Sequence, residues 1–162
     1  MFRLSKLTDY AVVVLVQLSR AGVVQTSPGI AAKTGIPEPT VGKVLKAMMA
    51  RGLVTSQRGA RGGYRLTRDL ADVAVSQVIE AIDGPIALTA CVDGGECENG
   101  CLCPMRGRWD PVNGAIRAAL AAITLADMES ALLPFAIRVP AADLHRHAVS
   151  VGLPVVNFLP VV

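Results

Sequence analysis

The sequence predicts a mainly α-helical fold: a winged helix-turn-helix with a small two-stranded β wing, followed by a long dimerisation helix. Three observations lead to this prediction. Apolar residues repeat at helical spacing in four separate segments of the 162-residue chain. Two short strand-like segments flank a basic, glycine-rich turn at residues 58–63. Alanine is dense between residues 115 and 122, which favours close approach of two helices.

The first three helices are expected between residues 5 and 50. Ser5 can cap the first, with Asp9 in its first turn facing the positive helix end. A second, short helix opens at Ser27-Pro28, and a third begins near Pro37. The inward-facing stripes of the first and third helices are Ala11, Val14, Leu15 and Leu18, and Val41, Val44, Leu45 and Met48.

The short helix, the tight turn at residues 34–36 and the longer helix form a helix-turn-helix pattern. In such units the second helix enters a DNA major groove, with its N-terminal residues nearest the bases. Thr40, Lys43 and Lys46 lie off the inward stripe, so we expect them to face DNA. The alternative is an ordinary helical hairpin within a core.

A β-hairpin is expected directly after the third helix. Residues 52–57 and 64–66 are strand-like, and the turn between them carries Arg58, Arg61 and several glycines. Glycine lets a hairpin tip approach a phosphate backbone closely, while arginine supplies positive charge. A solvated hairpin is the alternative, but the preceding helix-turn-helix favours a DNA-contacting wing.

The second half of the chain is predicted to hold two more long helical stripes. One is Val75, Val78, Ile79 and Ile82, ending at residues 83–85; the other is Ile116, Ala119, Leu120 and Ile123. Asp110 and Pro111 suit the N-cap and first position of the later helix. We interpret that helix as a dimerisation helix; the alternative is a helix folded back on its own domain. Thr124 suits the cap of a short final helix reaching about Leu133.

Charge is distributed unevenly along the chain. Residues 1–68 hold 11 Lys/Arg and two acids (+9), whereas residues 69–162 hold five Arg and 11 acids (−6), giving the net charge of +3. A basic front half favours nucleic acid as partner over a merely solvated basic surface. No apolar run is long enough for a membrane span, and the N-terminal residues show no signal-peptide pattern, so a cytoplasmic protein is expected. No Ser/His/Asp grouping or P-loop indicates an enzyme or a small-molecule substrate.

All four cysteines lie between residues 91 and 103. Cys91, Cys97 and Cys103 follow a C-x5-C-x5-C spacing, with Cys101 as an additional thiol. Thiolates favour zinc or iron–sulfur clusters, and zinc sites usually use two separated pairs of ligands. One loop without a second pair therefore favours a cluster over structural zinc, free thiols or a disulfide. A thiol redox enzyme using Cys101 and Cys103 is the least favoured alternative.

Two segments and the cysteine spacing together resemble the Rrf2 family of bacterial winged-helix transcription regulators. The segments are Leu4-Ser-Lys-Leu-Thr-Asp-Tyr-Ala11 and Arg58-Gly-Ala-Arg-Gly-Gly-Tyr64. Within the family, the sequence is most similar to regulators of SUF-type iron–sulfur cluster assembly, as residues 103–109 also indicate. The resemblance covers about residues 1–130. It implies a homodimer on a palindromic operator, with one cluster per subunit, acting as a repressor of cluster assembly genes. Nitric oxide or redox sensing is the alternative within the family.

The resemblance also assigns residues. It implies cluster thiolates at Cys91, Cys97 and Cys103, and DNA contacts around Thr40, Lys43 and Arg58. Where some members have a histidine as fourth ligand, this chain has Arg106, which cannot ligate. Other members use an acid from the partner subunit's first helix, and Asp9 occupies that position. Cys101 is a local alternative as fourth ligand, or a replacement for Cys103. The nuclearity, 2Fe–2S or 4Fe–4S, therefore stays open. Some members carry glutamate where Gly42 stands, so their base readout does not transfer.

Four regions follow from these patterns. We expect a DNA-binding domain over residues 1–83, a cluster-binding loop over 84–108, and the dimerisation and final helices over 109–133. Residues 134–162 hold four prolines and, from residue 150, no charged side chain. They are expected to form either a mobile tail or a loosely packed strand.

Overall fold

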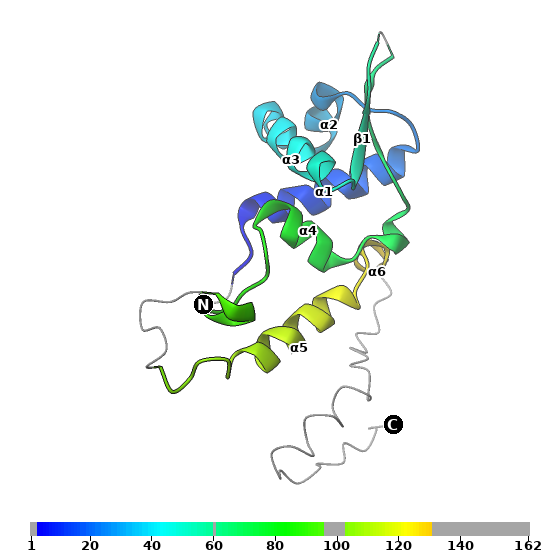
Figure 1. The fold of residues 1–162 in the computed structure, drawn as a ribbon. Helices are drawn as coiled ribbons and strands as arrows, with labels where there is room; N and C mark the ends of the chain where they lie inside the picture. Colours follow the sequence, from blue (N-terminus) through cyan, green and yellow to red (C-terminus); the bar gives the residue numbers. More distant parts are fainter. Residues whose placement is uncertain (1–2, 60, 96–102, 131–162) are drawn as a thin grey trace, which may run out of the picture.

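The computed structural model describes residues 3–59, 61–95 and 103–130. Six α-helices, two strands and two short 3₁₀-helices follow one another in that part of the chain (Figure 1). In chain order they are α1 (Lys6–Ala21), α2 (Ser27–Thr34), α3 (Glu38–Ala50), β1 (Val54–Gln57), β2 (Gly63–Leu66), η1 (Leu70–Asp72), α4 (Val75–Ile82), η2 (Val92–Gly94), α5 (Asp110–Ala121) and α6 (Leu125–Glu129). The predicted winged helix-turn-helix is confirmed.

Local sequence signals set the helix ends. The Ser5 hydroxyl accepts a hydrogen bond from the Thr8 backbone N–H at 3.1 Å, which satisfies a donor at the start of α1. Thr26 caps α2 in the same way, one residue before the Ser27-Pro28 pair that marked the helix in the sequence. Gly22 and Gly35 end α1 and α2 in the left-handed conformation, which glycine adopts without a steric penalty.

The wing is an antiparallel hairpin in which Val54 pairs with Leu66 and Gln57 pairs with Gly63. In Figure 1 it projects beyond α2 and α3 at the top of the molecule. Near its turn, the wing is joined to the α1–α2 connection by two backbone hydrogen bonds between Gln25 and Tyr64, of 3.0 and 2.8 Å. A Cβ at Gly63 would stand 2.5 Å from the Gln25 carbonyl oxygen, so this junction requires glycine.

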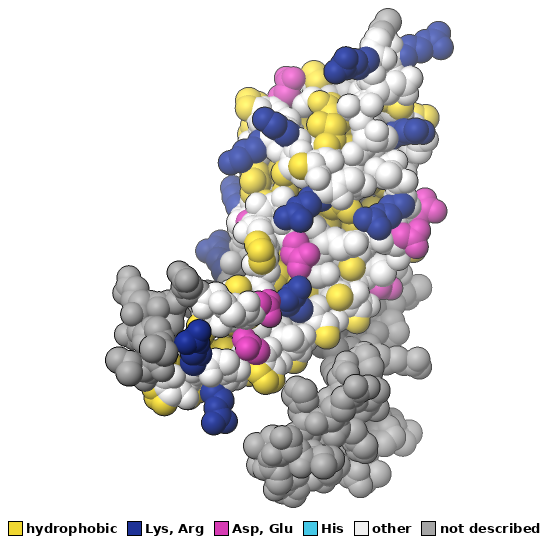
Figure 2. Space-filling model, in the orientation of Figure 1, with side chains coloured by type: hydrophobic (Ala, Val, Ile, Leu, Met, Phe, Trp, Pro, Cys, Tyr) yellow, Lys and Arg dark blue, Asp and Glu magenta, His cyan; other side chains and the backbone are white. Residues whose placement is uncertain are grey.

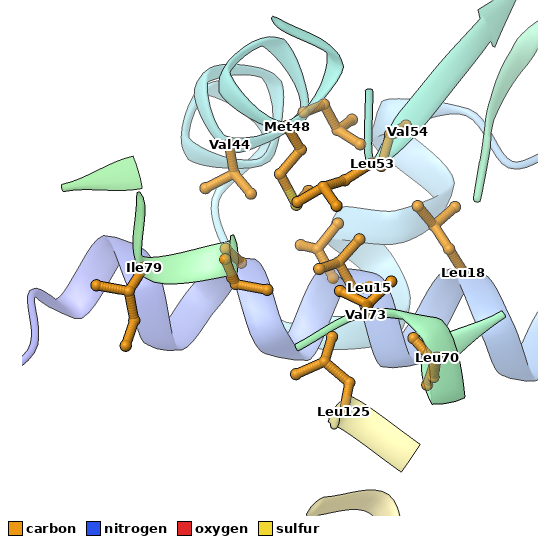
Figure 3. Packing of buried hydrophobic residues seen from close by; sticks show 14 of the residues in the cluster. Leu15, Leu18, Val44, Met48, Leu53, Val54, Leu70, Val73, Ile79 and Leu125 are labelled. Carbon is orange, nitrogen blue, oxygen red and sulfur yellow. The ribbon is translucent and has the colours of Figure 1, made fainter. Parts of the chain in front are cut away.

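One aliphatic core contains buried residues of α1, α2, α3, η1, α4 and α6, and α5 packs at its edge through half-buried residues. Figure 3 shows Val44 and Met48 pointing from α3 toward α1. Leu125 of α6 approaches the same core beside Val73 and is fully buried. The stripes predicted for α1 and α3 are all buried, as expected, and the α4 stripe is buried except for Ile82, which is half-buried.

The C-terminal elements close back on the winged helix. The Val75 N–H donates to the Ile123 carbonyl and the Leu125 N–H donates to the Val73 carbonyl, each at 2.9 Å. Arg20 of α1 forms a 2.8 Å ion pair with Glu129 of α6. The final helix is shorter than predicted, because α6 ends at Glu129; residues 131–133 lie outside the described part.

The start of α5 differs by one residue from the prediction. Trp109, rather than Asp110, is the N-cap, and Pro111 is the second helical residue. The turns over residues 104–109 already bring Trp109 to helical angles, so the helix begins before the polar side chain that we expected to cap it. In the described part of the chain, no helix is both long and apolar enough to cross a membrane.

Candidate nucleic-acid interface and cysteine loop

Helix α3 presents the side chains that the sequence assigned to the major groove. Lys43 and Lys46 are exposed, and Thr40 is half-buried at the start of the helix. Pro37 provides no side-chain cap, and Glu38 in the first turn is the acidic residue that faces the positive end of the α3 dipole. The inward residues of α3 hold it against α1 and leave these polar side chains on its outer faces.

The wing adds a second group of basic side chains. Arg58 and Arg61 are exposed at its turn, and Arg65, which we did not predict as a contact, is exposed on β2. Within residues 3–59, 61–95 and 103–130, none of these three forms an ion pair. Figure 2 shows Lys and Arg side chains concentrated over the upper half of this face, above most of the acidic ones. A polyanion would therefore meet α3 and the wing together.

Gln25 is a site residue that our sequence analysis missed. It is buried, and its side chain donates to the Gln17 carbonyl at 3.0 Å and accepts from Lys33 Nζ at 3.1 Å. Its backbone pairs with Tyr64 of β2 and so attaches the wing to the α1–α2 connection. Lys33 therefore contacts the same residue that pairs with the wing. No periodic signal marks a lone glutamine in a connection, so only the tertiary structure identifies it.

The cysteine loop is described at both of its ends. Cys91 and Cys103 are half-buried and free of disulfides, whereas Cys97 and Cys101 lie outside the described residues. The Thr89 hydroxyl lies 3.3 Å from Cys91 Sγ, within hydrogen-bond distance for sulfur. Among the residues that are described, no three potential metal ligands come together, so the predicted ligand set is not tested as a set.

The backbone after Cys91 folds back tightly. Asp93 adopts a left-handed conformation with φ of 54°, and a Cβ at Gly95 would collide with the Ala90 carbonyl. Residue 95 is therefore packed against the residue that precedes Cys91. The chain therefore reverses sharply directly after Cys91.

Asp9 lies exposed in the first turn of α1. That turn is fixed by Asp83 at the end of α4, whose carboxylate accepts from the Thr8 hydroxyl at 2.7 Å. Partial burial of the Asp83 carboxyl opposes its ionisation, yet the hydrogen bonds from Ser5 and Thr8 together outweigh burial and lower its pKa. The structure describes one chain, so it does not test Asp9 as a ligand to a second subunit.

A helix-turn-helix with an exposed basic second helix and a basic wing defines a DNA-binding transcription regulator. The chain belongs to the Rrf2 family, whose model, described as an iron-dependent transcriptional regulator, matches residues 4–131. The Escherichia coli HTH-type transcriptional regulator IscR is 31% identical over 129 residues, which cover 78% of this chain and 79% of that protein. A Mycobacterium tuberculosis protein, Rv1287, provisionally named as an HTH-type transcriptional regulator, is 33% identical over 82% of this chain and 84% of its own length.

Solved structures share the fold. T. potens IscR is 27% identical, with a TM-score of 0.58, over 79% of this chain and 86% of that one. CymR, the global cysteine regulator of B. subtilis, has a TM-score of 0.61 over 79% of this chain and 96% of that one. Its 23% identity shows a common fold and nothing about the signal that is sensed.

Proposed function

We propose that this Rrf2-family transcriptional regulator acts as a homodimer that senses an iron–sulfur cluster and represses iron–sulfur cluster assembly genes from a palindromic operator. The observation that carries the proposal is the attachment of one cysteine-rich loop to a winged helix whose basic side chains face outward on α3 and the wing. Its likeness to regulators named IscR supports the choice of gene class.

DNA recognition is assigned to two elements. The exposed Lys43 and Lys46 on α3 would approach phosphates and base edges in the major groove. Arg58 and Arg61 would follow the backbone or enter the minor groove from the wing. We assign base contact to Thr40 as well, because it lies near the N-terminus of α3 and N-terminal residues of recognition helices are nearest the bases. Gly42 offers no side chain there, so base readout depends on its neighbours.

The donor set fits a cluster. Cys91 and Cys103 supply two soft sulfurs that are accessible to a ligand, and the loop between them carries Cys97 and Cys101. When bound, a cluster supplies a redox-sensitive and oxygen-sensitive group. The chain's own residues do the rest: the Thr89 hydroxyl is positioned to donate to the Cys91 thiolate, and Gly95 permits the reversal that returns the loop to Cys91. The fourth ligand is Asp9 of the partner subunit or Cys101.

The dimer is assigned to α5. Its inner residues Ile116 and Leu120, together with Ile123 just after its end, pack against the core and are half-buried. On another side Val112 is 45% exposed, and the alanines at positions 115, 118 and 122 are exposed beside it. This small-residue apolar face would allow two copies of α5 to pack closely.

The decisive test is anaerobic purification with an absorbance spectrum and an iron and sulfide assay. We expect coloured protein with iron and sulfide, and a Cys91→Ala variant that is colourless, still dimeric and altered in its affinity for duplex DNA. Wild-type protein that is colourless with stoichiometric zinc would instead establish a structural zinc site. Wild-type protein without iron, sulfide or DNA binding would refute the proposal.

The fourth ligand can be resolved with matched single variants. Asp9→Ala and Cys101→Ala each remove one candidate without touching Cys91, Cys97 or Cys103. We expect only one of them to shift the cluster spectrum and shorten its lifetime in air. If neither variant changes the spectrum, both candidates are wrong.

A further inference from the structure

A polar stripe on α5 holds the loop on both sides of Cys91. Its members, Asp110, Asn113 and Arg117, recur at helical spacing. Asp110 Oδ1 accepts from the Asp93 backbone N–H at 3.2 Å, and Arg117 donates to Asp93 Oδ2 at 2.9 Å. The cysteine loop is therefore bonded to the helix that we assign to the dimer.

Asn113 is the one buried member of this stripe, with 1% of its surface exposed. Its Oδ1 accepts from the Leu88 backbone N–H at 3.0 Å, and its Nδ2 donates to the Ile86 carbonyl at 2.9 Å. One side chain thus satisfies two backbone groups of the segment that leads into Cys91. In sequence it stands three residues before Ile116, where an apolar residue would continue the inward stripe.

The two hydrogen bonds indicate that Asn113 fixes the position of the segment before Cys91 and does not merely fill space in the core. A buried amide is costly unless both of its ends are hydrogen-bonded, and an aliphatic residue would fill the same space without that requirement. The two bonds fix both the direction and the register of residues 86–88 relative to α5. Asp110 and Arg117 are exposed, so water competes for their contacts with Asp93.

We propose that Asn113 is a positioning residue that couples the cysteine loop to α5, so that a change of ligation at Cys91 alters the orientation of the dimer helix. The inference rests on the proposed function. Leu88 is three residues from Cys91, and its N–H is held directly by Asn113. A displacement of the ligand segment is therefore passed to α5, and the chain just after α5 is bonded to the start of α4, where the Ile123 carbonyl accepts from the Val75 N–H.

The test compares two affinities for each variant. A duplex selected from a random-sequence library with the wild-type protein is titrated with cluster-loaded and with cluster-free protein. For wild type we expect the two dissociation constants to differ by about 5-fold to 150-fold, the usual range of allosteric coupling. In Asn113→Leu we expect that ratio to fall below about 2, while the cluster spectrum, the dimer mass and the cluster-free affinity stay close to wild type. A purely structural role would instead weaken both forms alike.

Two further measurements keep the outcomes separate. Hydrogen exchange of cluster-free protein should show faster exchange at Leu88 in Asn113→Leu, with α1 to α3 unchanged. Arg117→Gln, an exposed member of the same stripe, should retain the wild-type ratio. If Asn113→Leu does not yield a folded dimer, Asn113→Ser is judged by the same criterion.

If an Asn113 variant keeps the wild-type ratio of the two dissociation constants, Asn113 does not couple the cysteine loop to α5, and the proposed function is unaffected. If wild-type protein binds a cluster but its cluster-loaded and cluster-free forms have the same dissociation constant for the duplex, both the coupling and the proposed sensing function are wrong. Wild-type protein without any cluster refutes the proposed function at the first step, before any variant is compared.

Discussion

The Asp83 carboxylate accepts a hydrogen bond from the Thr8 hydroxyl at 2.7 Å and thereby joins the end of α4 to the first turn of α1. The backbone N–H of Ser5 also points to this carboxylate, at 3.4 Å. The first turn of α1 carries Asp9, and the chain continues from Asp83 toward Cys91. One carboxylate therefore joins the start of α1 to the segment that leads from α4 toward Cys91.

Acid should weaken this junction. The Asp83 pKa lies below its ordinary value, since the bonds from Ser5 and Thr8 outweigh partial burial, so ionised Asp83 stabilises the fold. That contribution is complete above the unfolded pKa of about 3.9 and is lost as the pH falls through the lower folded value. We expect Asp83→Asn to be less stable at pH 7 by about 1 kcal/mol or less, because the group is solvent-accessible.

Urea unfolding at fixed protein concentration, at pH 7 and near pH 3, measures this effect. The difference between wild type and Asp83→Asn should shrink at the lower pH. Asp69→Asn, an exposed carboxyl in the turn before η1, serves as the control and should change little at either pH. A difference that is the same at both pH values would contradict the role of ionised Asp83.

DNA binding should depend on salt through α3 and the wing. Each phosphate contact contributes about −0.9 to the slope of log K against log salt concentration. Lys43→Gln and Arg58→Gln should each make that slope shallower by about 0.9 and weaken DNA binding. Titrations between 50 and 200 mM salt give the slope.

Arg20→Gln is the matched control for charge, because Arg20 is already paired with Glu129 at 2.8 Å. It should leave the slope unchanged. An equal change of slope in Arg20→Gln would show that net charge, rather than contact at α3 and the wing, sets the salt dependence.

The wing should lose its position when Gly63 gains a side chain. A Cβ there collides with the Gln25 backbone, which cannot retreat because Gln25 is buried and bonded to Gln17. We expect Gly63→Ala to destabilise the protein by about 1–3 kcal/mol and to weaken DNA binding. Chemical denaturation and DNA titration measure the two effects.

Gly42→Ala makes the same chemical change where there is space. No atom lies within 4 Å of a Cβ at Gly42, and the residue is inside α3. Replacing an interior helical glycine should stabilise the protein by about 0.5–1 kcal/mol. The changes in the free energy of unfolding should therefore have opposite signs in Gly63→Ala and Gly42→Ala. If both variants are destabilised, the loss at Gly63 does not arise from its contact with Gln25.

Thr89 should change the reduction potential of the cluster that we propose. Its hydroxyl lies 3.3 Å from Cys91 Sγ, and hydrogen bonds to sulfur help to set the reduction potential of a cluster. A donor to the thiolate favours the more negatively charged, reduced state, so Thr89→Val should lower the midpoint potential. Thr89→Ser keeps the hydroxyl and should stay near wild type. Equal potentials in both variants would exclude this role.

Much of the fold follows from short-range pattern. The stripes of α1 and α3, the Ser5 and Thr124 caps and the wing hairpin were all predicted and are confirmed. The errors are local: α5 begins one residue early and α6 ends at Glu129. Lys43, Lys46, Arg58 and Arg61 are exposed as expected, while the cluster ligands and the domain limits remain predictions.

The sequence by itself determined which segments are helix or hairpin, because periodicity and capping act over a few neighbouring residues. The tertiary structure alone decided how those segments are joined. Thr8 meets Asp83 across 75 residues, and Asn113 meets Ile86 across 27. No local pattern encodes such pairs, since each depends on the packing of helices that bring a polar side chain opposite an unsatisfied group only after the core has formed.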